Sequence, residues 1–485
     1  MIENLPLSDE DRKNLKLFDI ILRSNISTST YNLLKKHFIP ELSMSSIFIL
    51  QARISKLSHV TEVSYDCCPN TCCCFTGTYA ALDSCPFCKH ARYNSEGHSY
   101  KKYKYLPIEP RIRSLYLTDR YAEVLRYRSV PRDNAIEDVF DGIHYRTLCQ
   151  TRVTIDGAEL DHRFFSEIPD VALGLMLDGF QIFRAQRDGG ATCWPLIALN
   201  FNLPPDIRTQ LAHIIPLSII PGPKAPKDFN SFLHPFVDEC KKLTAGVWAF
   251  DSHQNKTFKL HVYPISVHGD MMAIKYVMNF KGPNGKSPCR ACHITRVRDT
   301  SQTRTPFYVP LTPPRNQRVG LISYDPHNLP LRSDDTYRTQ LTNIQNAHSA
   351  GSRTQREKDY GINRECILTE LPSISISRSF PHDWMHLCLE NHGKNLVSFW
   401  KGTYKGVTTG NLRHFPTADP PPVSYRPPNL FRHSHVRGHG TRPPHLRLRS
   451  FLSFFPVALA CTLCTLTRRM FPLVLTAMFA VYSFA

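Results

Sequence analysis

The sequence predicts an α/β protein of the α+β kind, in which a mixed sheet is flanked by helices. Three short, almost continuously apolar runs are typical of buried strands and carry this prediction: Val171–Leu177, Trp194–Phe201 and His213–Ile220. Helix-compatible stretches follow at Phe232–Leu243 and Met271–Met278. Between these two, the run Phe258–Val267 is expected to form one further strand.

The chain of 485 residues is long enough for several cores, and we expect five parts. They are an N-terminal helical segment (1–62), a Cys-rich zinc-binding module (63–100) and a linker or helical region (101–165). A catalytic domain with an insertion at about 281–365 (166–410) and an aberrant tail (411–485) follow.

The N-terminal segment is predicted to contain two helices. Ser8 and Asp11 have the spacing of a capping box at a helix start, and a second helix is expected from Thr30 to His37. A packing role is favoured over DNA readout for this segment.

The charge of the chain indicates a polyanionic partner. Lys and Arg number 59 against 41 Asp and Glu, a net charge of +18. Residues 411–485 hold nine Arg, no Lys and Asp419 as the one acid, so they contribute +8 and leave +10 for the first 410 residues. The basic character is therefore moderate and spread along the chain.

Cysteine clustering predicts a structural metal site. Seven of the 16 cysteines fall between Cys67 and Cys88, and the polar, acidic start of the chain does not resemble a secretory signal. Metal binding in a reducing compartment is therefore favoured over disulfides or unliganded thiols. The predicted Zn²⁺ ligands are Cys68, Cys72, Cys85 and Cys88, whereas Cys67, Cys73 and Cys74 are interpreted as passengers.

A second cysteine pair, Cys289 and Cys292, lies inside the predicted catalytic domain. Because only two cysteines are local, a metal there needs distant ligands, and His293, His386 and Cys366 are the candidates. A stabilising zinc or a thiol pair is favoured over a catalytic zinc.

Four acidic residues are candidates for a divalent-metal site with three carboxylates. Asp178 and Asp270 each follow an apolar run, and Asp383 and Glu390 lie seven residues apart in a helix-compatible stretch. Carboxylates at two strand ends and on a helix are typical of an RNase H-like core, which cuts or joins phosphodiester bonds. Each aspartate also has an ordinary interpretation, a turn at Asp178-Gly179 and a helix cap at Asp270.

Taken in order, these motifs resemble the fungal branch of the CACTA (En/Spm-type) DNA transposases over roughly residues 15–410. The resemblance is carried by the combination of Tyr65-Asp66 with the first cysteine cluster, Leu177–Phe180, the Asp270 segment, Cys289-x-x-Cys292 and Phe380–His386.

This resemblance implies an RNase H-like DDE/D transposase that cuts at terminal inverted repeats with two Mg²⁺ or Mn²⁺ ions. It implies that Asp178 and Asp270 are the first two acids and that either Asp383 or Glu390 is the third. It also implies double-stranded DNA as partner, self-association, a nuclear location and no small-molecule substrate.

The composition departs from that family after Gly410, where Pro, His, Arg and Ser dominate. Such a tail indicates truncation or a shifted reading frame, so the alternative is a catalytically dead derivative that still binds zinc and DNA. A third hypothesis, a membrane anchor at Phe451–Ala485, is disfavoured because Arg468-Arg469 splits the run into stretches shorter than the ~20 residues that span a bilayer.

Overall fold

The computed structural model divides into two compact units after Asp383, and each is treated by itself below. The residues it describes are 8–24, 26–37, 46, 47, 49, 50, 60–132, 135–181, 192–222, 224–298, 307–309, 311 and 322–396. The predicted tail 411–485 and its apolar end lie outside these residues. Within them, no helix combines the length and apolar character needed to cross a membrane.

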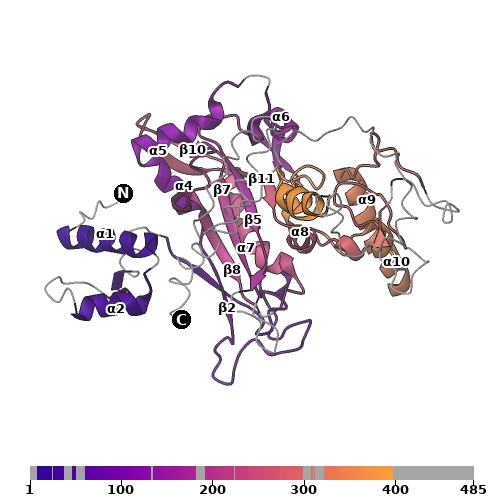
Figure 1. Ribbon diagram of the computed structural model, residues 1–485, viewed down its shortest axis with the longest axis horizontal. Coiled ribbons are helices and arrows are strands. Elements are labelled where there is room, and N and C mark those ends of the chain that lie inside the picture. Colours follow the sequence, from indigo (N-terminus) through magenta and orange to yellow (C-terminus); the bar gives the residue numbers. More distant parts are fainter. Residues whose placement is uncertain are drawn as a thin grey trace, which may run out of the picture. The chain divides into compact units, whose positions relative to one another are not determined.

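A seven-stranded mixed sheet forms the centre of the first unit (Figure 1). Its order is β1-β2-β8-β7-β5-β11, with β6 pairing to β7. β5, β7 and β8 form an antiparallel meander, and β11 pairs in parallel with β5. The strands are β1 (Val63–Asp66), β2 (Lys102–Tyr105), β5 (Val171–Leu177), β6 (Phe180–Gln181), β7 (Thr192–Asn200), β8 (Ile215–Ile220) and β11 (Val262–His268). The mixed α/β architecture is therefore confirmed.

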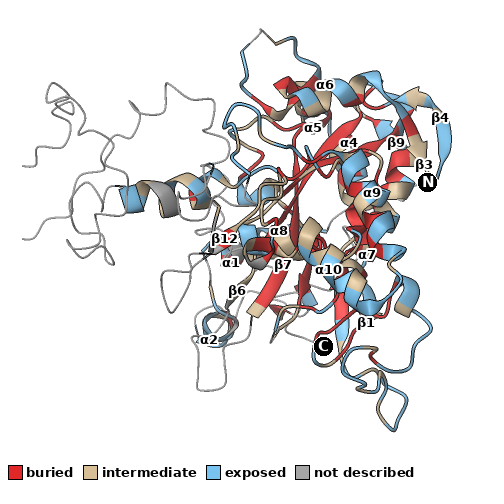
Figure 2. Ribbon diagram, turned by 90° about the vertical axis from the view of Figure 1, so that its right-hand side faces the viewer, coloured by how far each residue is buried: buried red, intermediate tan, exposed pale blue. Residues whose placement is uncertain are grey.

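The central strands are buried, as the red segments of Figure 2 show, and most of their buried residues are apolar. Every residue of β5 is buried, which explains why its sequence is apolar without alternation. The helix α7 (Phe229–Ala245) contributes its apolar side to the same core and contacts β11 (Figure 1). It begins where the Asp228 side chain accepts a hydrogen bond from Asn230 N, and ends at Gly246 with φ +95°.

The stretch predicted as one strand, Phe258–Val267, is two strands, so that prediction is wrong. β10 (Lys256–Leu260) pairs with β9 (Val247–Asp251) in a separate hairpin, and β11 then joins the central sheet. The change of sheet falls at His261, whose buried imidazole is 2.9 Å from the Asp170 carboxylate. A continuously apolar sequence does not reveal such a change, because both strands bury residues.

The central sheet also begins earlier than predicted. β1 and β2 flank the Cys-rich module, and Tyr105 of β2 pairs with Ser218 of β8. The module is therefore an excursion between two strands of the sheet, and the region 101–165 includes β2 as well as helices.

The remaining elements of the first unit precede the strands of this sheet, connect them or follow them in the chain. In the N-terminal segment, Ser8 and Asp11 make the predicted reciprocal capping contacts at the start of α1. The elements are α1 (Asp9–Arg23), α2 (Thr28–His37), α4 (Glu109–Tyr116), α5 (Asp119–Val124), α6 (Ile143–Gln150), β3 (Arg152–Ile155), β4 (Ala158–Arg163), α8 (Met271–Val277), β12 (Val297–Arg298), β13 (Phe307–Tyr308), α9 (Asp334–Gln345) and α10 (Ala350–Tyr360).

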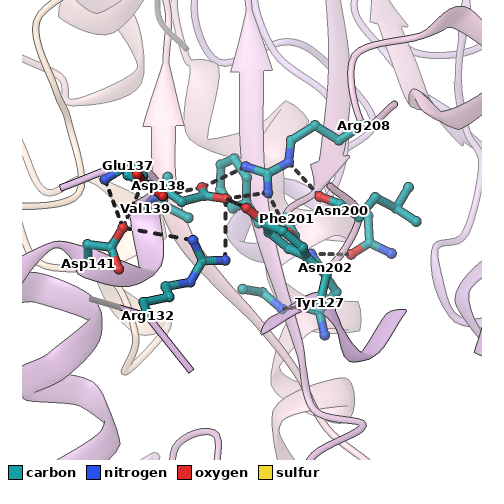
Figure 3. A network of polar contacts seen from close by, with 12 residues as sticks. Tyr127, Arg132, Glu137, Asp138, Val139, Asp141, Asn200, Phe201, Asn202 and Arg208 are labelled. Atoms are coloured by element: carbon teal, nitrogen blue, oxygen red, sulfur yellow. Dashed lines mark hydrogen bonds and ion pairs between the residues drawn. The ribbon is translucent and has the colours of Figure 1, made fainter. Parts of the chain in front are cut away.

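A buried ion pair fastens the segment before α6 to one end of the sheet (Figure 3). Arg208 donates to both oxygens of Asp138, at 2.8 and 2.7 Å, and to the carbonyls of Leu203 and Phe201 just beyond β7. Tyr127 also donates to Asp138. Although burial opposes it, Arg208 lowers the pKa of Asp138, so the pair stays charged at neutral pH.

The second unit is described over residues 384–396. It contains a π-helix, Met385–Gly393, which carries His386 and Glu390. A π-helix is an uncommon conformation, which occurs mostly as single turns inside α-helices and frequently at functional sites.

Candidate functional site

Asp178 and Asp270 lie at the same end of two adjacent strands. β5 and β11 run in parallel, and His268 at the end of β11 is in register with Met176 of β5. Each aspartate is two residues beyond that pair. This is the arrangement that the sequence predicts for the first two acids; acids at opposite ends of the sheet would have excluded a shared site.

Two glycines allow the strand ends to approach closely. A Cβ atom on Gly269 would lie 2.7 Å from the carbonyl oxygen of Leu177, and one on Gly179 would lie 2.5 Å from the Trp194 ring. Neither position has room for a side chain without a shift. The glycine beside Asp270 therefore lets the ends of β5 and β11 come close, and the glycine beside Asp178 leaves room for the Trp194 ring of β7.

Each acid also makes the local contact that its ordinary interpretation predicts. An Asp270 oxygen accepts from Ala273 N at 2.6 Å and caps α8, and an Asp178 oxygen accepts from Gly179 N at 2.7 Å. These bonds orient the carboxylates. Capping and metal binding are compatible, because a carboxylate has two oxygens and about four acceptor sites.

Asp383 reaches the ends of β5 and β11 from a distant part of the chain. We call these two strand ends, with Asp178, Asp270 and Asp383, the carboxylate edge. The segment before it follows the outer side of β11, since Ser373 Oγ donates to Pro264 O at 2.5 Å and Val267 N donates to Ser379 O at 2.7 Å. The chain therefore runs in the direction of β11 and arrives beyond its end. Asp383 there interacts electrostatically with His268 and Arg290.

His268 is a neutral neighbour of these acids. Burial, helped by the positive charge of Arg290, lowers the pKa of His268 to about 4 against the opposing effect of Asp383. Its Nε2 lies 2.9 Å from Ser266 Oγ. At neutral pH this imidazole therefore adds no charge to the edge.

The second candidate for the third acid, Glu390, belongs with His386 to the second unit. The choice between Asp383 and Glu390 as the third acid stays a prediction. The three acids do not form a ready-made cluster of metal ligands; among the described residues the one group of that kind consists of cysteines.

The pair Cys289 and Cys292 forms a knuckle next to this edge. Ala291 N donates to Cys289 Sγ at 3.3 Å, as backbone amides do in metal knuckles, and Cys289 hydrogen-bonds with Cys292 and His382. His382 was not singled out from the sequence, although it precedes Asp383 directly.

The three distant ligands predicted for this pair lie in different surroundings. Cys366 is fully buried in the main hydrophobic core, where burial raises the pKa of its thiol to about 12, and its role as a ligand stays a prediction. His293 interacts electrostatically with Cys289 and stays a candidate. His386 belongs to the second unit and also stays a prediction.

The four predicted zinc ligands converge. The sulfur atoms of Cys68, Cys72, Cys85 and Cys88 all lie within 4.8 Å of one another, and those of Cys68 and Cys88 are 3.4 Å apart. Three are buried and Cys88 is exposed. Such a set matches the chemistry of tetrahedral thiolate ligation of Zn²⁺, which has Zn–S distances near 2.3 Å.

Two tight turns bring these thiols together. Thr71 N donates to Cys68 O at 2.7 Å and Lys89 N donates to Cys85 O at 2.9 Å. Thr71 and Lys89 adopt left-handed backbone conformations, with φ of 58° and 62°. Residues other than glycine rarely adopt this backbone conformation, which indicates that the surrounding structure of the module imposes the turns.

The other cysteines of the cluster pack instead of converging. Cys67 and Cys74 belong to the main core and face each other in an isolated bridge. Cys73 is buried among the ligand cysteines, with its sulfur 4.0 Å from that of Cys85. The module is also tied to the chain just after β8 and to α7, because Lys101 Nζ donates to Gly222 O at 2.7 Å and Cys74 N donates to Ser231 Oγ at 3.0 Å.

Comparison with known proteins finds one family model that matches the central part of the chain, where Asp178 and Asp270 lie. No curated protein matches the chain closely enough to count as a relative. Residues 154–309 match the family described as "Transposase family tnp2". The match includes Asp178, Asp270 and the Cys289/Cys292 pair, and leaves out the four-cysteine cluster and Asp383. The central part of this chain is therefore similar to tnp2 transposases, which supports a transposase that acts on DNA.

Proposed function

We propose that this protein is a CACTA-type transposase with an RNase H-like core, which cuts and joins DNA at the terminal inverted repeats of its element. The observation that carries the proposal is the common edge shared by Asp178 and Asp270. Adjacent parallel strands bring them together inside the segment that matches tnp2 transposases.

The donor set at this edge fits hard divalent cations. Carboxylate oxygens are the ligands preferred by Mg²⁺ and Mn²⁺, and Asp178, Asp270 and Asp383 or Glu390 would hold them. When bound, such ions activate a water or a DNA 3′-hydroxyl and stabilise the leaving oxygen. The protein contributes the orientation of the carboxylates, through the Asp270 cap and the Asp178 turn.

The four-cysteine cluster would hold one structural Zn²⁺ that keeps the module folded between β1 and β2. The module has few apolar residues of its own, since the small cluster around these thiols consists of cysteines packed against Tyr79. A metal is the usual substitute for a core in such a segment. The knuckle Cys289/Cys292 would add a second stabilising zinc, with His382 as a further ligand candidate.

The partner is double-stranded DNA, and the location is the nucleus. The net charge of +10 over the first 410 residues, counted from the sequence, favours contact with phosphates. Self-association at paired element ends follows from the same proposal.

Metal-dependent cleavage tests the proposal directly. The full-length protein is incubated with a supercoiled plasmid carrying the element ends, with Mn²⁺ or with EDTA, and nicking is measured. We expect Mn²⁺-dependent nicking that falls by at least about 100-fold in Asp178→Asn and Asp270→Asn, because metal ligands act jointly. Asp383→Asn and Glu390→Gln identify the third acid.

The matched control is Asp161→Asn, which removes a fully exposed carboxylate on β4. Equal nicking by Asp270→Asn and the wild-type protein would refute the assignment of the site. If the protein binds DNA but never cleaves it, the alternative of a catalytically dead derivative holds, which the altered composition after Gly410 favours.

A further inference from the structure

Two consecutive methionines, Met271 and Met272, lie exposed directly beside Asp270. Met271 is 60% exposed and Met272 is 41% exposed, whereas the other methionines in the described part of the chain are buried. Single exposed apolar side chains are common on protein surfaces. Two adjacent ones next to a candidate metal ligand are a feature that packing within the chain does not explain.

The cap of α8 holds both methionines at the end of β11. The Asp270 carboxylate accepts from Ala273 N at 2.6 Å, so Met271 and Met272 are the two residues enclosed by this hydrogen-bonded turn. Because consecutive Cα atoms are about 3.8 Å apart, the Cα atoms of both methionines lie within about 8 Å of that of Asp270. A substrate that reaches a metal on Asp270 therefore passes close to them.

The opposite side of α8 is committed to the core. Ala273, Ile274 and Val277 are buried there. Tyr276 also packs edge-on against Trp194, with 5.4 Å between the ring centroids. The helix is therefore fixed in an orientation that leaves the two methionines open to a ligand.

A cation accompanies the methionines on α8. Lys275 is one helical turn after Met271, so the two lie on the same side of the helix. The Lys275 Nζ lies 5.1 Å from the centroid of the Tyr276 ring. Exposed apolar side chains beside a positive charge suit a nucleotide, which presents a base face and a phosphate.

We propose that Met271 and Met272 form an apolar wedge that packs against an unstacked DNA base next to the phosphate that is cut. This inference rests on the proposed function, because it names the part of the substrate that the same site holds. Apolar side chains do not bind phosphate, and base faces are the large apolar surface of DNA. In a stacked duplex neighbouring bases cover these faces, so contact requires one base step to open, as it does around the apolar wedges of DNA-bending proteins.

Base unstacking can be measured without cutting. The full-length protein is mixed with a duplex that carries 2-aminopurine at the junction of the element end with the flanking DNA, in Ca²⁺, and a gel verifies that no strand is cut. We expect the wild-type protein to raise the 2-aminopurine fluorescence, because unstacking removes quenching by neighbouring bases. Met271→Gln/Met272→Gln should lose most of this rise. Met271→Leu/Met272→Leu keeps the apolar surface and should retain it.

Nicking of two substrates separates a wedge from a structural role. In Mn²⁺, the Gln double variant should nick fully paired DNA about tenfold more slowly than the wild-type protein, because the burial of two methionines is lost. A two-base mismatch at the junction opens the step in advance and should restore most of the rate. Equal slowing on both substrates would overturn the inference.

Phe250→Gln is the matched control. Phe250 is 40% exposed on β9, in the hairpin that precedes the start of β11, whereas Asp270 follows its end. Equal fluorescence in the wild-type protein and the Gln double variant would overturn the wedge, while nicking by the wild-type protein would leave the proposed function intact. A smaller oligomer of the Gln double variant with an unchanged DNA signal would instead assign the methionines to a protein interface. If the wild-type protein neither bound the duplex nor nicked DNA, the proposed function would be refuted and the wedge with it.

Discussion

The Cys-rich module and the carboxylate edge assemble their side chains in different ways. The outer ligand cysteines are 20 positions apart, and two tight turns place all four thiols within 4.8 Å. The edge instead gathers Asp178, Asp270 and Asp383 from three distant parts of the chain, through the parallel pairing of β11 with β5. We therefore propose that the module depends on local geometry and on a bound metal, whereas the arrangement of the acids depends on the large core.

This difference implies that the two regions lose structure for different reasons. Around the ligand thiols the module has a small core of cysteines and Tyr79, and the strands of the edge belong to the main hydrophobic cluster. Zinc removal should unfold the first and spare the second. A substitution in the main hydrophobic core or in its buried ion pair should destabilise the strands and spare the module.

The largest effect is expected for loss of a zinc ligand. Cys85→Ser should release the zinc and unfold residues 63–100, because apparent zinc-binding free energies of about 10–16 kcal/mol support such modules. Hydrogen exchange measured by mass spectrometry should show fast exchange in the module and unchanged protection in β5 and β11. Cys73→Ala is the matched control, since Cys73 lies 4.0 Å from Cys85 but is outside the predicted ligand set. Zinc loss in the control instead would reassign the ligands.

Loss of the buried Arg208 should destabilise the sheet and leave the Cys-rich module unchanged. Arg208→Met removes both charge-assisted hydrogen bonds of the buried Asp138 and leaves it with Tyr127 and the more distant Arg132, which should lower the free energy of unfolding of the sheet by about 3–5 kcal/mol. Urea unfolding followed by tryptophan fluorescence measures this change, and the zinc content should stay constant. The double variant Arg208→Met/Asp138→Leu should recover much of the loss. A stable single variant would show that the pair does not hold this end of the sheet.

A smaller effect should separate the two roles of Asp270, the cap of α8 and the proposed binding of metal. Asp270→Ala removes the cap of α8 and should cost about 1 kcal/mol, whereas Asp270→Asn retains a good cap and should cost only a few tenths. Chemical denaturation of both variants gives these values. Both variants should lose Mn²⁺-dependent nicking alike. Residual nicking in the better-capped variant would mean that the cap, and not a metal, explains this residue.

The smallest effect should come from a turn of the module. Lys89 has φ of 62°, so Lys89→Gly relieves backbone strain and should stabilise the zinc-loaded module by up to about 1 kcal/mol. Lys358→Gly, within the helix α10, is the matched control and should be destabilising. Chelator titration of zinc release measures the first change. Destabilisation by Lys89→Gly would indicate that its side chain matters more than its backbone.

The sequence predicts short-range features well and long-range pairing poorly. Four features could be predicted from the sequence, because each depends on neighbouring residues. They are β5, the aspartate after it, the cysteine turns and the cap at Asp270. The split at His261 and the extension of the sheet by β1 and β2 were missed, because strand partners are set by the whole fold.

The same limit applies within the candidate site. Arg290 and His382 give no sequence signal of their own, and they matter only because the segment before Asp383 follows β11. Gly179 and Gly269, which flank the acids, are the residues whose meaning could have been recognised earlier. A glycine beside a strand-end acid often marks a close backbone approach.

The covering of β11 by the segment before Asp383 also bears on shortened forms of the chain. β11 is the last strand of the sheet, and Ser373 and Ser379 bond along its outer side. A product ending before Ser373 would leave β11, an apolar strand, exposed at the side of the sheet with unpaired backbone groups. Such an edge is a template for intermolecular pairing. Early termination should therefore yield insoluble aggregates rather than a soluble inactive fragment.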